Sequence, residues 1–147
     1  MTPTRREQLV VEAQHARRGI AVSARDHRVI VDETENYGGH NAGANPVEHL
    51  LAGIAAGSLV VLRMLGAIDI ADSAVLRTSG TLNVDRVMGA DDGPVFEVVR
   101  LEWEVADVDH AARLQAVLAD LAARRPGQAL IDAAGQWVES VSVAQDS

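Results

Sequence analysis

Residues 32–67 read DETENYGGHNAGANPVEHLLAGIAAGSLVVLRMLGA, a polar loop that contains glycines followed by a long apolar run. Asn45 is a favourable N-cap, Pro46 suits the first position of a helix, and Glu48 stands three residues after the cap. These signals predict a helix that begins at Pro46 and runs to about Leu65. The helix is apolar on nearly every face, so we expect it to be buried on all sides.

The segments on either side of this stretch alternate between strand and helix patterns. Strand patterns cover residues 8–14, 19–25, 27–33, 75–84, 95–105 and 137–144, and helix patterns cover residues 107–125 and 128–134. The second of the long helices has Asp107 or Asp109 as its cap. The order predicts an α+β fold with antiparallel strands, in a single domain over residues 1–147.

The composition excludes several kinds of chemistry. The chain has 147 residues and a net charge of −8, its 13 basic residues are all arginine, and it has no cysteine. Thiol catalysis, thiolate metal sites and lysine Schiff bases are therefore impossible. The acidic balance argues against nucleic acid or an anionic membrane as a partner.

The N-terminal sequence lacks the apolar run of a signal peptide. The longest uncharged apolar run, from Leu50 to Leu62, is 13 residues, whereas about 20 are needed to cross a bilayer. We therefore expect a cytoplasmic protein that does not span a membrane.

The quoted stretch resembles the OsmC/Ohr family, the osmotically inducible and organic hydroperoxide resistance proteins. The matching features are the acidic pair Asp32-Glu33, the glycine pair Gly38-Gly39, the Asn45-Pro46 pair, and a small-residue helix that ends in Leu-Arg-Met at 62–64. The order of the flanking elements matches as well. The resemblance implies an OsmC-like fold, with antiparallel sheets and a long buried central helix, and an intertwined homodimer.

The resemblance also implies a thiol peroxidase, and here the sequence departs from the family. The cysteine of the central helix falls on Gly57, and the second cysteine falls on Arg125. The family's glutamate falls on Val47, and its N-terminal arginine corresponds to Arg17 or Arg18. Without a thiol the chain cannot form a sulfenic acid, so we expect no consumption of organic hydroperoxide with a dithiol donor.

The vacated position suggests a binding site. Glycine at 57 and valine at 47 replace polar groups, and an apolar hollow favours an apolar ligand. We expect a small apolar or amphipathic ligand, or a structural role, at the cleft of a dimer. The predicted lining is Val47, Leu51, Ile54 and Gly57, with Arg17 or Arg18 at a polar mouth that takes a carboxylate.

Two alternatives remain open: an enzyme that needs no thiol, and a peroxide-linked role with thiols supplied by a partner. The weak catalytic candidates are Glu48, His49, His40 and Arg18. Glu48 is better explained as part of the helix cap, and Ser58 as a helical serine bonded to the preceding turn. The histidines are too few and badly spaced for a metal site, so no metal and no other cofactor is predicted.

The expected homodimer has its own signal on the long helix. Gly53 and Gly57 lie four residues apart on one face, with Ala52 and Ala56 beside them. Small residues at this spacing let two helix backbones approach closely. A second copy of the helix would also cover the apolar faces that one domain leaves free.

Overall fold

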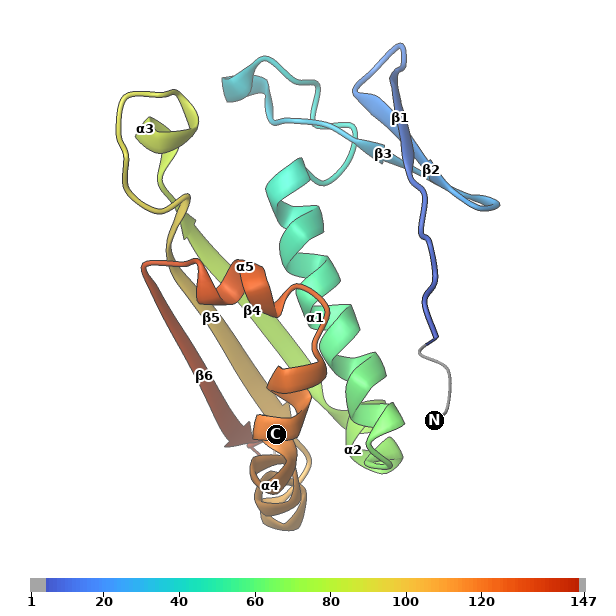
Figure 1. Ribbon diagram of the computed structural model, residues 1–147, viewed down its shortest axis with the longest axis vertical. Helices are drawn as coiled ribbons and strands as arrows, with labels where there is room; N and C mark the ends of the chain where they lie inside the picture. Colours follow the sequence, from blue (N-terminus) through green and yellow to red (C-terminus); the bar gives the residue numbers. More distant parts are fainter. Residues whose placement is uncertain (1–4, 146–147) are drawn as a thin grey trace. The chain divides into compact units, whose positions relative to one another are not determined.

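Three short strands begin the described part of the chain, which is residues 5–145 of the computed structural model (Figure 1). They are β1 (Glu12–His15), β2 (Ile20–Ala24) and β3 (His27–Val31), and they form an antiparallel sheet in the order β1-β2-β3. The strands predicted at 19–25 and 27–33 are confirmed. The first is shorter than predicted, because residues 8–11 are exposed and unpaired with the sheet.

A loop leads from β3 through the short helix η1 (Glu35–Tyr37) to the long helix α1 (Pro46–Met64). The predicted cap of α1 is confirmed, since the Glu48 N–H donates to Asn45 Oδ1 at 2.8 Å and the Asn45 N–H donates to Glu48 Oε2 at 2.7 Å. Beyond the last turn, Gly66 adopts a left-handed conformation with φ +87°. Glycine adopts this conformation without steric strain and therefore commonly follows the end of a helix.

The remaining elements follow α1 directly. They are α2 (Ile68–Ser73), β4 (Val75–Leu82), α3 (Val84–Val87), β5 (Phe96–Val105), α4 (Val108–Arg124), α5 (Gln128–Asp132) and β6 (Gln136–Val143). The chain divides into an N-terminal unit up to His49 and a C-terminal unit from Leu50 onward. The α+β class is confirmed, and the single domain over residues 1–147 stays a prediction.

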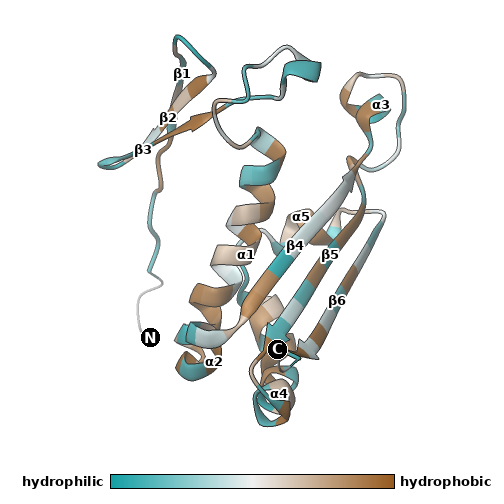
Figure 2. Cartoon of the chain, turned by 180° about the vertical axis from the view of Figure 1, so that it is seen from behind, coloured by the Kyte–Doolittle hydropathy of each residue, from teal (hydrophilic) through white to brown (hydrophobic). Residues whose placement is uncertain are grey.

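The core of the C-terminal unit lies on one face of the sheet β4-β5-β6. Alternate residues of β5 point into it, and Val99, Leu101, Trp103 and Val105 are all buried. Helices α1, α2 and α4 cover this face through Leu62, Ile70 and Leu114, among others. Figure 2 shows the resulting alternation of hydrophobic and hydrophilic residues along the strands. Burial of such side chains is the main driving force for this packing.

Two details of the C-terminal unit differ from the prediction. Strand β6 pairs with β5 in parallel, while β4 pairs with β5 antiparallel. The chain between β5 and β6 forms α4 and α5, and a crossover through helices is the usual way to join parallel neighbours. The strand predicted to reach Val84 ends at Leu82, because Asn83 caps α3 by accepting the Arg86 N–H at 3.0 Å.

The prediction that α1 is buried on all sides is wrong for the chain alone. Only Ile54, Ser58, Val61 and Leu62 of this helix are buried, whereas Leu50, Val60 and Met64 are 51%, 50% and 76% exposed. One sheet and two helices can cover only one stripe of a helix, so the rest stays uncovered.

By length and composition, α1 also passes a simple test for a membrane-crossing helix. It has 19 residues, most of them apolar, and only 22% of its most apolar stretch is buried. The core helices of soluble proteins pass the same test. The absence of a membrane span therefore stays a prediction.

Candidate functional site

The two positions at which the resemblance expects cysteines lie next to each other in the C-terminal unit. A Cβ placed on Gly57 of α1 would be 3.6 Å from Cδ of Pro126, the residue that follows Arg125. This is an ordinary van der Waals distance. The proline ring therefore fills the space beside Gly57.

Arg125 directly follows the last residue of α4, and its side chain is buried in an ion pair. Its Nη2 lies 2.6 Å from Oε1 of Glu139 on β6, and its Nη1 donates to Gln128 Oε1 at 3.2 Å. The same Glu139 oxygen accepts the Trp103 Nε1–H at 2.9 Å. The side chains of Arg125 and Glu139 are 0% and 7% exposed. The arginine is thus held by β6 and α5 in a site from which water is largely excluded.

The apolar residues of the predicted lining fall on both sides of the boundary between the units. Val47 belongs to the N-terminal unit, while Leu51, Ile54 and Gly57 belong to the C-terminal unit. Ile54 is buried, and its Cγ1 would be 3.3 Å from a Cβ on Gly127. The pocket proposed from these four residues stays a prediction.

The polar side chains of α1 that could be considered for catalysis either have a structural role or lack a hydrogen-bond partner. The Glu48 carboxylate is used in the helix cap. The Ser58 hydroxyl is buried and donates to the Ile54 carbonyl at 2.7 Å, as expected for a helical serine. His49 is half-buried, and its Nε2 has no hydrogen-bond partner among residues 5–145. Within residues 5–145, none of these three side chains takes part in an ion pair.

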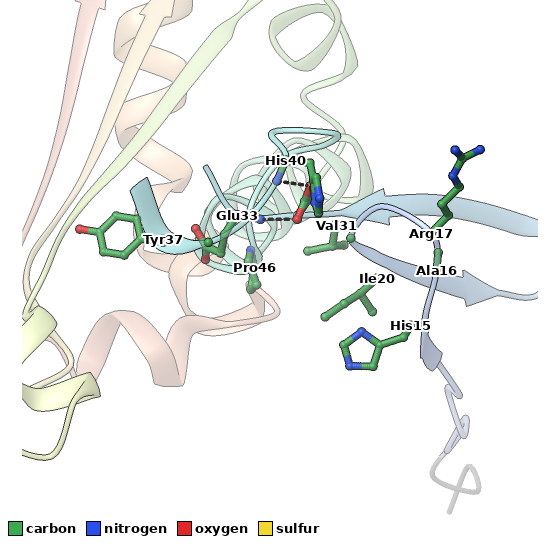
Figure 3. Close-up of a pocket in the computed structure, with 13 residues that line it drawn as sticks. His15, Ala16, Arg17, Ile20, Val31, Glu33, Tyr37, His40 and Pro46 are labelled. Atoms are coloured by element: carbon green, nitrogen blue, oxygen red, sulfur yellow. Dashed lines mark hydrogen bonds and ion pairs between the residues drawn. The ribbon is translucent and has the colours of Figure 1, made fainter. Parts of the chain in front are cut away.

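A hollow of about 330 Å³ lies within the N-terminal unit (Figure 3). Its apolar lining comes from Ile20, Val31 and Pro46, and polar side chains surround it. The polar lining residues are His15, Arg17, Asp32, Glu33, Tyr37 and His40. Apolar lining with a few polar groups is the usual character of small-molecule sites.

Of the two arginines predicted at a polar mouth, only Arg17 lines this hollow. Its side chain is exposed, and in Figure 3 its guanidinium points away from Ile20 and Val31. Arg18 is exposed as well but is not part of the lining. Both exposed arginines can rotate at little cost, but only Arg17 lies at the hollow, which makes it the stronger of the two candidates.

Asp32 lines the hollow, is buried, and was not among the site residues predicted from the sequence. Its carboxylate accepts three backbone N–H groups, from Glu33 at 3.0 Å, His40 at 2.9 Å and Ala42 at 3.1 Å. These hydrogen bonds, the one from Ala42 first, lower the pKa of the Asp32 carboxyl below its ordinary value. The acidic pair at 32–33 was the only sequence signal that pointed to it.

No protein-family model and no curated protein sequence matches the chain. Among solved structures, it is similar to an OsmC-like protein from Mycoplasma pneumoniae, with a TM-score of 0.73 and 13% identity over 95% of this chain and 99% of that one. It is also similar to the organic hydroperoxide resistance protein OsmC from Legionella pneumophila, with a TM-score of 0.67 and 18% identity over 95% and 99%.

A third similar structure is the organic hydroperoxide resistance protein OhrB of Bacillus subtilis, with a TM-score of 0.55 and 18% identity over 94% of this chain and 98% of that one. The chain has the OsmC fold. The resemblance drawn from residues 32–67 is thereby confirmed at the level of the fold. The sequence of this OsmC-like chain contains no cysteine. That the family's two cysteine positions correspond to Gly57 and Arg125 stays a prediction.

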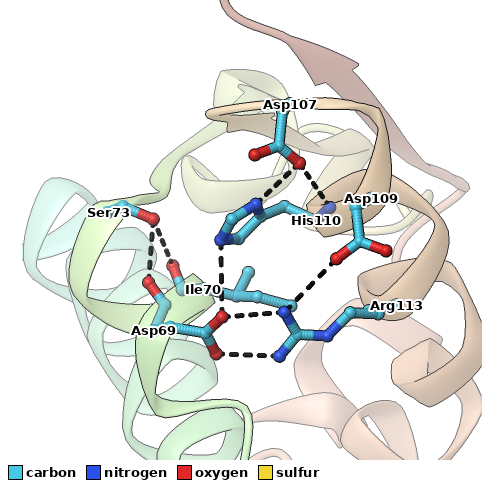
Figure 4. Close-up of polar contacts among 7 residues, drawn as sticks. All are labelled: Asp69, Ile70, Ser73, Asp107, Asp109, His110 and Arg113. Carbon is cyan, nitrogen blue, oxygen red and sulfur yellow. Dashed lines mark hydrogen bonds and ion pairs between the residues drawn. The ribbon is translucent and has the colours of Figure 1, made fainter.

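The OsmC-like chain also contains a polar cluster that the sequence analysis missed (Figure 4). The Arg113 guanidinium on α4 donates two hydrogen bonds to Asp69 on α2, at 2.7 and 2.9 Å. His110 lies between two carboxylates, with Nδ1 2.7 Å from Asp107 and Nε2 3.4 Å from Asp69. The cluster joins α2 to α4 at the surface. The contacts occupy its charged groups, so we assign it a structural role.

This cluster makes stability depend on pH in the acid range. Hydrogen bonds from Arg113 lower the pKa of Asp69 to about 2, from an ordinary value of 3.8. A carboxyl whose pKa is lower in the folded state stabilises the fold above its unfolded pKa and loses that contribution as the pH falls. We expect wild type to exceed Asp69→Asn in unfolding free energy above about pH 4. Urea unfolding should show the difference shrinking towards pH 2; a difference independent of pH would contradict this assignment.

Proposed function

We propose that this OsmC-like protein is a soluble, cytoplasmic homodimer that is not a thiol peroxidase and that binds a small amphipathic molecule bearing a carboxylate. The absence of cysteine supports the proposal that the protein is not a thiol peroxidase. Where the resemblance expects two thiols, the chain has a glycine packed against Pro126 and an arginine paired with Glu139. Neither residue can be oxidised to a sulfenic acid.

The hollow in the N-terminal unit carries the binding proposal. Ile20, Val31 and Pro46 offer an apolar surface for a hydrocarbon chain. Arg17 stands at the rim, and a guanidinium is well suited to take a carboxylate. The region around Gly57 offers less room, because Pro126 already contacts that position.

The exposed stripe of α1 supports the homodimer. We define this α1 stripe as Leu50, Gly53, Ala56, Val60 and Met64, which share one face at helical spacing and are all exposed. An apolar stripe of this kind is usually covered by a partner. The small residues at its centre favour close approach of an identical helix.

Titration with octanoate and with octanol tests the binding proposal, because the two probes share a hydrocarbon chain and differ in the carboxylate. We expect octanoate to perturb the amide resonances around Ile20 and Val31. Arg17→Ala should weaken octanoate binding by up to about five-fold, the range for an exposed ion pair, and should leave octanol binding unchanged.

Arg18→Ala is the matched control, since it removes the same charge one residue away from the hollow. It should leave both affinities unchanged. The binding proposal fails if neither probe binds at millimolar concentration, or if the perturbed resonances lie outside the N-terminal unit. Equal weakening by the two arginine variants would rule out a specific role for Arg17.

A further inference from the structure

The wall of the hollow is a loop that has little apolar packing of its own. Residues 33–42 contribute Glu33, Tyr37 and His40 to the lining, and Tyr37 and His40 are exposed. Such a loop needs other contacts to keep one conformation, because ordering its backbone costs conformational entropy.

Backbone hydrogen bonds supply some of those contacts, such as the one from the Asn41 N–H to the Glu33 carbonyl at 3.0 Å, and Asp32, directly after β3, supplies three more. It is buried, and its Oδ2 accepts the N–H groups of both His40 and Ala42, so one oxygen holds the far end of the loop. Its Oδ1 accepts the Glu33 N–H at the near end. Hydrogen bonds to an ionised acceptor are stronger than those between neutral groups.

Two glycines of this segment lie very close to the backbone that precedes it: Gly39 to Glu33 at the start of the loop, and Gly43, just after the loop, to Ile30 on β3. A Cβ on Gly39 would be 1.9 Å from the Glu33 carbonyl oxygen, and a Cβ on Gly43 would be 2.0 Å from the Ile30 carbonyl oxygen. Neither position can accept a side chain without a shift of the backbone. The two glycines and the Asp32 carboxylate thus favour the same conformation, in which the segment folds back on the backbone that precedes it.

We propose that Asp32 is the positioning residue of the binding site: it holds the 33–42 loop against β3 and so forms the wall that the ligand contacts. This inference rests on the proposed binding function and adds to it the residue that creates the site. Asp32 does not itself bind the ligand, because its carboxylate is already occupied by three N–H donors.

The substitution Asp32→Asn tests the inference, because it keeps the size of the side chain and removes its charge and one of its acceptor oxygens. We expect amide hydrogen exchange at His40 and Ala42 to become about ten-fold faster or more. Exchange in β2 and β3 should stay slow, and octanoate binding should weaken by about ten-fold. Glu35→Gln is the control: it neutralises an exposed carboxylate of the same loop that does not line the hollow, and it should change neither readout.

The exchange measurement needs no ligand, so it separates this inference from the proposed function. If wild type binds no octanoate but Asp32→Asn speeds exchange at His40 and Ala42, the binding function is wrong and only the loop anchor stands. Unchanged exchange at these two amides, or octanoate binding equal to that of Glu35→Gln, overturns the positioning role. If Asp32→Asn also speeds exchange of the amides in β2 and β3, the variant Asp32→Glu decides. Slow exchange in these strands together with partly retained octanoate binding supports the positioning role. Loss of both overturns it.

Discussion

We expect Arg125→Met to lower the free energy of unfolding by about 3–5 kcal/mol, the cost of leaving one buried charge without its partner. In this variant the Glu139 carboxylate, only 7% exposed, loses the guanidinium 2.6 Å away. Among residues 5–145, the Trp103 Nε1–H is then the one hydrogen-bond donor left to this carboxylate. Urea unfolding at a fixed protein concentration measures the loss, and a decrease below about 1 kcal/mol would contradict the prediction.

The double variant Arg125→Met with Glu139→Gln separates the charge from the packing. Glutamine keeps an oxygen that can accept the Trp103 Nε1–H and removes the unpaired charge. We expect the double variant to be more stable than Arg125→Met, because a buried ion pair contributes little net stability when both charges are removed together. If the two variants are equally unstable, lost packing of the arginine side chain is the cause.

Gly53→Leu dissociates the proposed homodimer while leaving the fold of one chain intact. A Cβ on Gly53 meets no atom within 4 Å among the described residues, and Gly53 is exposed, so we expect one chain to accept a leucine there. In a close helix crossing, overpacking costs about 1–3 kcal/mol per site. Since a symmetric dimer has two sites, we expect dimerisation to weaken by about thirty-fold or more.

Sedimentation velocity at micromolar concentration measures this change, and circular dichroism checks the fold. Ala123→Leu on α4 is the control, because it places a leucine at an exposed small residue outside the α1 stripe. Gly57→Leu is a poorer test, since Pro126 is already in contact with that position. A stable, folded wild-type monomer would refute the dimer, and an unchanged Gly53→Leu dimer would place the interface elsewhere.

The regular elements were predictable because their signals are local. The strand pattern over residues 95–105 predicted β5, which the structure has at Phe96–Val105. The caps were predictable for the same reason: Asp107 accepts the His110 N–H at the start of α4. The six-residue helix α2 was missed, because a segment of that length is too short to show a helical period.

The residues of the candidate site were harder to predict, because they meet only in the folded chain. Arg17 was expected at a polar mouth, and it lines the hollow of the N-terminal unit. Asp32 was noticed as part of an acidic pair, but nothing local indicates that its carboxylate accepts the N–H groups of His40 and Ala42. Arg125 was recognised as a replacement for a cysteine, without any indication of its partner.

The sequence by itself determined the order and type of most elements, the start of the central helix at Pro46, and the absence of thiol chemistry. These conclusions depend on periodicity and on capping residues, which involve only neighbouring residues, and on composition, which does not depend on the order of the residues. The tertiary structure alone decided that β6 lies parallel to β5, that Arg125 pairs with Glu139, and that α1 is covered on one stripe only. Each of these depends on contacts between segments distant in the chain, which form when the fold brings them together.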